Sequence, residues 1–517
     1  MFKGLAVFFI AAICVGLFII GFGQTFPSVQ LHEVGDFAAN SLLIADATHL
    51  KLLVGNYSRV GFNHPGPAFL YVLAAGEIVF FKLTHWVASP FSGQLHAVAL
   101  LSGFWIAAIG TLLFRMQRAA KGVPAAAIVT TALFVGVTAY INYQAFAGPW
   151  FPHLYYFAFA AFTVSIAALI MGRADGLVLL AVSLGFLVNG HASFLAMTVI
   201  MLVCALIANT WVSLHSGSRA SWVLSRQYLA GNRRTIAVAL AIVVLFLIPL
   251  ALQTILRFPG PLAEYAAFGH AHKANRLADA VRFAGLFWSN GVFGILLGAV
   301  ACAVLVTGNP ARDNEGRVAP ERALALALAS ATVAFLFYAV VGVDDLSLTY
   351  VGIFYYAVPA LALTLLIKRL LDNVTIATLP VAVIVCVAVG AFTAIRIHQP
   401  PENIAQYDDP RIPAAYASIR HLEAGGGVLV FDLDGGANGE RLWPTLVGVE
   451  AYAKREGHVP FCIAQNWQLV FTRAARCTPD QLQRAHGRWL VSAVPKEGAT
   501  GALSVAGLYL YPRGPAE

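Results

Sequence analysis

Two carboxylates lie close together soon after the first apolar stretch of the chain, at Glu33 and Asp36. An ionisable side chain beside apolar sequence is costly to place, so each one is a candidate for function. A carboxylate near a substrate hydroxyl can accept the proton that the hydroxyl loses as it attacks. We predict that Asp36 is such a base, with Glu33 as the competing base or a hydrogen-bonded neighbour. The alternative for Asp36 is a helix cap, with Gly35 allowing the turn.

The same polar segment carries groups that could hold an anion such as phosphate. They are Lys51, Arg59, Asn63 and His64. The charge on that phosphate requires cations or aligned donors. The simpler alternatives are that Arg59 anchors the segment to lipid headgroups and that Pro65 and Pro67 only start a helix.

Three further candidates for the same anion lie later in the chain: His191, Arg257 and Arg282. His191 follows Asn189-Gly190 at the end of an apolar stretch, where a helix-end histidine is an equal alternative. The sequence contains no zinc-ligand cluster and no glycine-rich loop of the nucleotide-binding type, which disfavours a soluble nucleotide-sugar donor. An Asp- and Gly-rich stretch, residues 432–440, lacks the ligand spacing of an EF-hand and is better explained as a turn after a strand.

The elements that position these groups are expected to be transmembrane helices, because the composition of the chain is far from that of a soluble domain. Of 517 residues, 59% are hydrophobic and only 11% are charged, against roughly one quarter charged in soluble domains. Apolar stretches long enough to cross a bilayer predict about eleven transmembrane helices. They lie near residues 4–22, 95–114, 123–141, 154–171, 177–190, 192–210, 236–255, 286–306, 323–342, 350–367 and 375–397.

Basic residues predict the orientation of these spans. Lys and Arg collect in alternate connections, at residues 115–121, 219–234, 312–322 and 368–369. Such connections stay on the cytoplasmic side, so the N-terminus is expected in the cytoplasm and everything after residue 398 outside. The net charge of +8 is therefore attributed to topology, and no nucleic acid is expected as a partner. The predicted location is a bacterial inner membrane, crossed many times.

Two segments are too polar to be counted as spans. One is Gly66–Leu83, which contains Glu77 and Lys82, and the other is Arg257–Phe283. Both are predicted to form helices in the outer membrane interface. The first external loop would then run from about Gly23 to Gln94.

The chain after residue 398 has the composition of an ordinary soluble domain. Strands are predicted at 427–433, 489–494 and 507–511, and helical spacing at 446–455. We expect residues 1–398 to form the transmembrane module and residues 399–517 a small α/β or α+β periplasmic domain. Cys462 and Cys477 lie in this tail and could form a disulfide in an oxidising compartment.

Three short motifs resemble the GT-C superfamily of membrane glycosyltransferases. They are an acidic residue soon after the first span, Asp36; an aromatic-flanked His64-Pro65-Gly66-Pro67; and Pro149-Trp150-Phe151-Pro152-His153. Related enzymes often have Asn where this chain has Phe151. The resemblance covers the layout of about residues 1–290 and implies an acidic first-loop base and a polyprenyl-phosphate sugar donor.

The resulting hypothesis is an inverting glycosyltransferase. It would move a monosaccharide from a polyprenyl-phosphate donor in the membrane lipid to an extracytoplasmic glycan, lipid or protein acceptor. The sequence leaves open whether a divalent cation is required, and no other cofactor is assigned. A membrane transporter or lipid-linked sugar flippase is the main alternative, although no internal repeat supports it. A ligase that uses a polyprenyl diphosphate and a non-catalytic assembly subunit are the others.

Overall fold

The computed structural model divides the chain into two compact units. The helical unit comprises Met1–Gln24 and Val98–Pro400, and the loop–tail unit comprises Thr25–Ala97 and Pro401–Glu517. The structure describes residues 2–118, 124–216, 221–271, 273–288, 291–307, 318–372, 379–423, 427–434, 439–464, 476–496 and 502–513. The basic connections near 119–121, 219 and 312–317 therefore lie outside the described residues.

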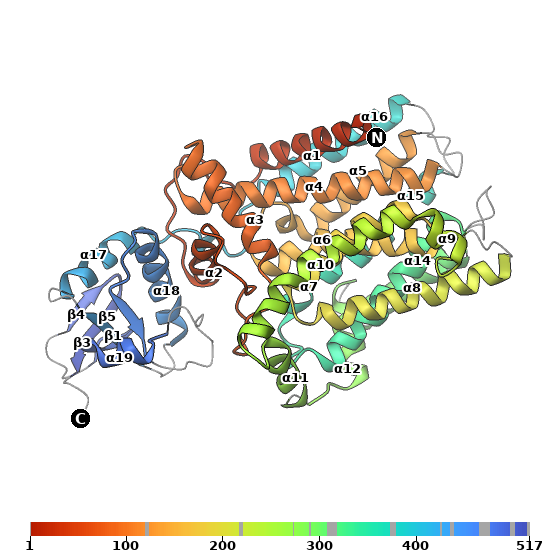
Figure 1. Cartoon of the computed structure of the whole chain (residues 1–517). Helices are drawn as coiled ribbons and strands as arrows, with labels where there is room; N and C mark the ends of the chain where they lie inside the picture. Colours follow the sequence, from red (N-terminus) through yellow and green to blue (C-terminus); the bar gives the residue numbers. More distant parts are fainter. Residues whose placement is uncertain are drawn as a thin grey trace. The chain divides into compact units, whose positions relative to one another are not determined.

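The helical unit is built from long apolar helices (Figure 1). They are α1 (Phe2–Phe22), α4 (Pro90–Arg118), α5 (Pro124–Asn142), α6 (Phe151–Ile170), α7 (Leu177–Gly190), α8 (Phe194–Ser216), α10 (Arg233–Leu256), α13 (Gly291–Thr307), α14 (Pro320–Val341), α15 (Ala357–Asp372) and α16 (Leu379–Ile397). Shorter helices join them: η2 (Tyr143–Ala145), η3 (Ala174–Gly176), α9 (Arg226–Gly231), α11 (Pro261–Ala271), α12 (Leu277–Leu286) and η4 (Thr349–Tyr356). Helix α4 begins in the loop–tail unit.

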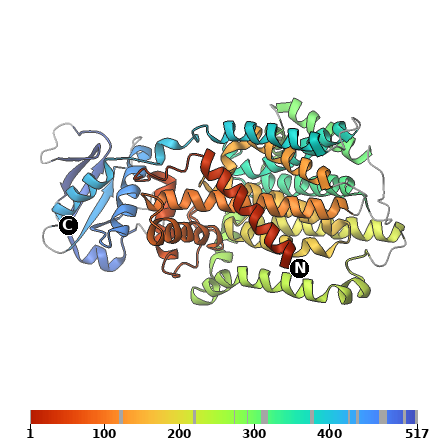
Figure 2. The same cartoon turned by 90° about the horizontal axis from the view of Figure 1, so that it is seen from above.

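Helix α6 is the centre of the helical unit. It is buried along its whole apolar length, and α7, α8, α14 and α15 pack around it (Figure 2). Helix α10, in contrast, leaves large apolar side chains such as Leu240 and Val244 more than half exposed. Apolar surface of this kind is stable in contact with lipid chains. The chain is thus a multi-pass membrane protein.

Eight of the described helices are long and apolar enough to span a bilayer. They are Gly4–Phe22, Pro90–Gln117, Ala126–Ala145, Phe151–Ile170, Phe194–Leu214, Arg233–Leu256, Pro320–Val341 and Thr349–Leu371. Three shorter apolar helices, Ala174–Gly190, Phe293–Leu305 and Ala382–Ile397, coincide with the remaining predicted spans. The mainly helical membrane fold is confirmed, and the number of eleven crossings stays a prediction.

The polar segment after α1 forms three short helical elements. Helix α2 covers Gly35–Ala47, and α3 (Ala68–Gly76) begins directly after Pro67 and continues into the π-helical turn η1 (Glu77–Leu83). Prolines at a helix start cost no hydrogen bond, because the first amides of a helix have no intrahelical acceptor. The predicted helix at Gly66–Leu83 is confirmed, and its place in the membrane interface stays a prediction.

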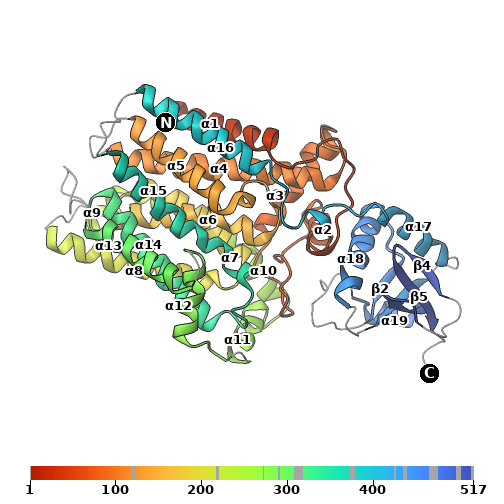
Figure 3. The same ribbon diagram turned by 180° about the vertical axis from the view of Figure 1, so that it is seen from behind.

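The tail is an α/β domain with a five-stranded sheet in the order β2-β1-β3-β5-β4 (Figure 3). The strands are β1 (Val428–Leu433), β2 (Phe461–Ile463), β3 (Ala485–Ser492), β4 (Leu503–Val505) and β5 (Leu508–Arg513). Strands β2, β1 and β3 are parallel, and β3, β5 and β4 are antiparallel. The helices of the tail are η5 (Ile404–Gln406), α17 (Ile412–Leu422), α18 (Gly439–Arg455) and α19 (Pro479–Gln483). The predicted tail fold is confirmed.

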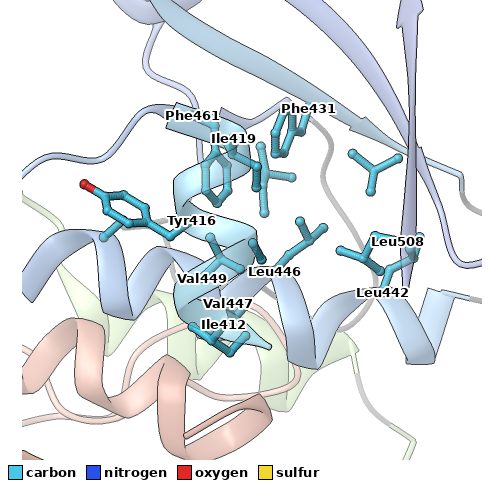
Figure 4. Packing of buried hydrophobic residues seen from close by; sticks show 14 of the residues in the cluster. Ile412, Tyr416, Ile419, Phe431, Leu442, Leu446, Val447, Val449, Phe461 and Leu508 are labelled. Carbon is cyan, nitrogen blue, oxygen red and sulfur yellow. The ribbon is translucent and has the colours of Figure 1, made fainter. Parts of the chain in front are cut away.

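One hydrophobic core joins the tail to the first loop. Ile412, Leu446 and Phe431 are among the buried residues of this core (Figure 4), and Ala38 and Leu42 of α2 belong to the same cluster. Helix α18 packs against α2 as well as against α17. The loop that carries Asp36 is therefore part of the same compact unit as the tail. The division of the chain at residues 398 and 399 stays a prediction.

A disulfide joins Cys462 of β2 to Cys477, 15 residues later, as the sequence predicted. Closing a loop of this length is worth about 3 kcal/mol in the loop-entropy description. We expect the Cys462→Ser, Cys477→Ser double variant to lose about 2 to 4 kcal/mol of stability. Chemical unfolding of the purified chain measures the loss. Cys386→Ser, at a free cysteine, is the control, and an equal loss in that control would contradict the prediction.

We expect the stability of the folded tail to depend on pH because of Glu450 of α18. Burial raises the pKa of its carboxyl to about 8, although the positive charge of Lys454 lowers it in part. Between the ordinary pKa of 4.5 and the raised value, the folded chain holds a proton that the unfolded chain has released. Stability therefore falls as pH rises through this window.

We expect Glu450→Gln to remove this loss of stability. The variant and the wild type should unfold alike near pH 4.5. At pH 8.5 the variant should be more stable by a few kcal/mol, on the order of 1.4 kcal/mol per unit of pKa shift. Unfolding of the full chain followed against pH makes the comparison. Glu456→Gln changes an exposed residue nearby, and its stability should vary with pH as that of the wild type does. If stability varied with pH in the same way in all three proteins, the prediction would be wrong.

Candidate functional site

Asp36 lies in the first turn of α2 and is partly exposed. The residue before it, Gly35, has φ +59, a backbone conformation that side chains disfavour. A Cβ atom at Gly35 would also lie 2.6 Å from Oε1 of Gln406 and 3.3 Å from the ring of Trp443. Glycine is thus required for the turn that starts the helix. The N-cap residue is Val34, without a side-chain cap, so Asp36 is not the cap of α2.

The hydroxyl of Tyr57 donates a hydrogen bond to Oδ1 of Asp36. Tyr57 is held by a short hairpin, in which it pairs with Asn63. In the same hairpin the amide of Ser58 donates to the carbonyl of Phe62 at 2.8 Å. The ring of Trp443, from α18, lies 6.4 Å from the Tyr57 ring between centroids. The hairpin therefore brings a phenol to a carboxylate 21 residues away.

Of the four predicted anion-binding groups of the loop, Arg59, Asn63 and His64 lie in this hairpin, and Lys51 precedes it in the chain. Lys51 is exposed after the end of α2, and Arg59 is partly exposed in the hairpin turn. The side-chain amide of Asn63 donates to the carbonyl of Gly55 at 3.1 Å. His64 is only 4% exposed, with its ring 5.8 Å from that of Phe62. Lys51 is accordingly the most accessible of the four and His64 the least.

Glu33 is placed differently from Asp36. It is 2% exposed, and its Oε1 lies 2.6 Å from Nη1 of Arg455. The hydroxyl of Ser41 also donates to Oε1 at 2.5 Å. A buried carboxylate paired with a guanidinium is compensated in charge and held in one orientation by these contacts. This geometry fits the hydrogen-bonded neighbour that the sequence offered as the alternative for Glu33.

The later candidates belong to the helical unit. His191 ends α7, and its Nδ1 accepts a hydrogen bond from the amide of Ser193 at 3.3 Å. Arg257 is exposed at the end of α10. Arg282, on α12, is 73% exposed, with Nη1 3.8 Å from Oδ1 of Asp279. The Trp150 motif opens α6, where His153 is buried.

Comparison with solved structures gives two groups of membrane proteins. ArnT from Cupriavidus metallidurans bound to undecaprenyl phosphate has a TM-score of 0.48 and 11% identity, over 99% of this chain and 100% of that chain. The oligosaccharyltransferase AglB from Archaeoglobus fulgidus, with an inhibitory peptide and a dolichol-phosphate, has a TM-score of 0.41 and 11% identity, over 89% and 65%. Both are GT-C membrane glycosyltransferases. The sequence motifs resemble the same GT-C superfamily. No family profile and no curated protein sequence matches the chain.

Sequence reasoning did not assign three residues that the structure places beside Asp36 or Glu33: Tyr57, Trp443 and Arg455. Tyr57 was visible beside Arg59, but its contact with Asp36 depends on the hairpin. Trp443 and Arg455 lie in the tail, more than 340 residues from the loop in sequence. The one available signal was the aromatic composition of residues 57–62, which favours an ordered segment.

Proposed function

We propose that the chain is an inverting glycosyltransferase that takes a monosaccharide from a polyprenyl-phosphate donor. The acceptor is an extracytoplasmic glycan, lipid or protein. The observation that carries the proposal is the partly exposed Asp36 carboxylate, oriented by Tyr57 at the start of α2 in a multi-pass membrane protein. A carboxylate held in one orientation is suited to accept a proton from a bound hydroxyl.

The proposed reaction needs one base and no general acid. Asp36 accepts the proton of the acceptor hydroxyl, whose oxygen forms a bond to the anomeric carbon. The bond from that carbon to the donor phosphate oxygen breaks, and the polyprenyl phosphate leaves with the electron pair. A single displacement inverts the anomeric centre. Tyr57 is proposed to keep the carboxylate in position by its hydrogen bond.

In the loop–tail unit, Lys51, Arg59, Asn63 and His64 are proposed to bind the donor phosphate. In the helical unit, His191, Arg257 and Arg282 are proposed separately as donor-binding residues. Guanidinium groups are well suited to phosphate because they donate in pairs. Asp36 with Tyr57 is the proposed catalytic group, and Glu33 is proposed to support the loop. The chain is proposed to lie in a bacterial inner membrane, with its tail in the periplasm.

Purified protein in proteoliposomes tests the donor class directly. Radiolabelled polyprenyl-phosphate mannose, glucose and arabinose would each be supplied with a membrane extract as the source of acceptor. We expect label from one of these donors to appear in an acceptor fraction, and none when the label is on a nucleotide sugar. Polyprenyl-diphosphate glycans are the comparison. Transfer from a diphosphate alone indicates a ligase, and movement of lipid across the bilayer without transfer indicates a flippase; either result would refute the proposal.

A further inference from the structure

A buried polar network connects the tail to residues that come before and after Asp36 in the sequence. Its members are Glu33, Ser41, Glu77, Gln94 and Arg455. The first four are each 3% exposed or less. They come from the segment before α2, from α2, from η1 and from α4, while Arg455 is the last residue of α18. Four segments of the loop thus meet one side chain of the tail.

Arg455 makes the central contacts of this network. Its Nη1 lies 2.6 Å from Oε1 of Glu33, and its Nη2 lies 2.9 Å from Oε1 of Glu77. Nη2 also donates to the hydroxyl of Ser41 at 3.1 Å. Burial alone would lower the pKa of Arg455, but the charges of Glu33 and Glu77 outweigh burial and raise the pKa. The guanidinium therefore stays charged and holds two carboxylates at once.

Ser41 and Gln94 close the network. The Ser41 hydroxyl donates to Glu33 at 2.5 Å and accepts from the side-chain amide of Gln94 at 3.1 Å. The same amide donates to Glu77 at 2.7 Å. A planar guanidinium with donors in a fixed fork suits such a site, whereas the ammonium of a lysine offers one point of charge.

The anchor points lie on either side of the proposed base. Glu33 is three residues before Asp36, and Ser41 is five residues after it. The segment before Gly35 is held by the tail at two further points. The amide of Val34 donates to the carbonyl of Gln406 at 2.9 Å, and the amide of Asp409 donates to the carbonyl of His32 at 2.9 Å. The backbone that carries Asp36 is thus fixed by tail residues.

We infer that Arg455 is a positioning residue for the proposed base. Through Arg455, the tail domain holds the loop segment that carries Asp36 in the position needed for catalysis. The catalytic part of this inference rests on the proposed function, in which Asp36 is the base. Arg455 does not act on the substrate itself. It fixes Glu33 and Ser41, and these fix the turn at Gly35 from which Asp36 reaches its substrate. A small displacement of a base costs rate, because the reacting atoms must meet within a narrow range of distance and angle.

The test compares Arg455→Lys with wild type and with Lys454→Gln in the full chain. Lysine keeps the charge but cannot reach both carboxylates and Ser41 together. Lys454 also lies on α18 and contacts α2, through Asp46 at 2.9 Å and through the carbonyl of Leu42 at 2.9 Å, but it lies outside the network. Hydrogen–deuterium exchange reports the amides of residues 39–43, which have acceptors within α2. Turnover is measured with the polyprenyl-phosphate sugar that the wild type uses.

We expect Arg455→Lys to speed exchange at residues 39–43 by about 10-fold, with exchange in β1 unchanged. We expect kcat to fall about 10-fold as well, with KM for the donor within about twofold of wild type. Lys454→Gln should match the wild type in both measurements. Wild-type exchange at residues 39–43 in Arg455→Lys would overturn the inference. Equally fast exchange in β1 would also overturn it, because Arg455 would then support the whole unit.

A second variant covers the case in which Arg455→Lys does not fold. Glu33→Gln leaves the Arg455 and Glu77 pair intact and balanced in charge, and should still speed exchange at residues 39–43. The two proposals can fail separately. Full turnover in Asp36→Asn would refute the proposed base and leave the exchange result standing. Loss of turnover in Asp36→Asn with wild-type kcat in Arg455→Lys would refute only the positioning role.

Discussion

Asp36→Asn is expected to lower kcat for sugar transfer by about 10²- to 10⁴-fold, the usual contribution of a general base. Asparagine has nearly the same shape as aspartate and still accepts the hydrogen bond from Tyr57, but it cannot take up the proton of the acceptor. Donor binding should stay within about twofold of wild type, because the substitution removes a group that acts in the transition state. Steady-state turnover and donor binding in proteoliposomes measure the two effects separately.

Asp46→Asn is the matched control for this experiment. Asp46 lies on the same helix, where it pairs with Lys454 at the surface, and exposed pairs contribute little. Its turnover should equal that of the wild type. A normal rate in Asp36→Asn, or an equal loss in both variants, would show that Asp36 is not the base. Tyr57→Phe should give a smaller loss than Asp36→Asn, because it removes only the group that orients the carboxylate.

Arg455→Met is expected to reduce stability by about 3 to 5 kcal/mol, the cost of leaving a buried charge without its partner. Methionine keeps much of the volume of the side chain but leaves Glu33 and Glu77 buried without a cation. Both carboxylates would then have to bind a proton or draw in water. Urea unfolding of the full chain, followed by a signal from the loop–tail unit, measures the difference from wild type.

Neutralising the two carboxylates in the same chain distinguishes charge from packing. The Glu33→Gln, Glu77→Gln, Arg455→Met variant has no unpaired charge in the network and should recover most of the loss. If the triple variant were as unstable as Arg455→Met, the loss would come from packing of the side chain. Arg411→Met, at a partly exposed surface pair with Asp409, should change stability by about 1 kcal/mol or less.

Much of the fold could be predicted because the signals were local. Long apolar stretches predicted the helices of the membrane unit, and short strand-like runs predicted β1, β3 and β5. Strands β2 and β4 have only three residues each, too few for a periodic signal. The disulfide was predictable because Cys462 and Cys477 lie in a segment of polar composition. The prolines at 65 and 67 predicted the start of α3.

The candidate site was less accessible to sequence reasoning because its contacts are between distant segments. Asp36 was predicted from its position beside an apolar span. Glu77 was placed in an interfacial helix, and nothing in the sequence showed that it is buried beside Gln94 and Arg455. Arg455 lies in the stretch Lys454-Arg455-Glu456, which is typical of a solvent-exposed helix end. Only the fold shows that Arg455 faces two carboxylates.

The wide separation of the network's members along the chain restricts the order in which the protein can mature. Arg455 and Ser41 are 414 residues apart, so the ribosome makes nearly the whole chain before the partner of Glu33 exists. Until the membrane helices and α18 have been synthesised, Glu33 and Glu77 lack the guanidinium group that pairs with them. The loop is therefore complete only after α18 has been synthesised and has folded. A chain truncated before that helix would leave the loop without Arg455.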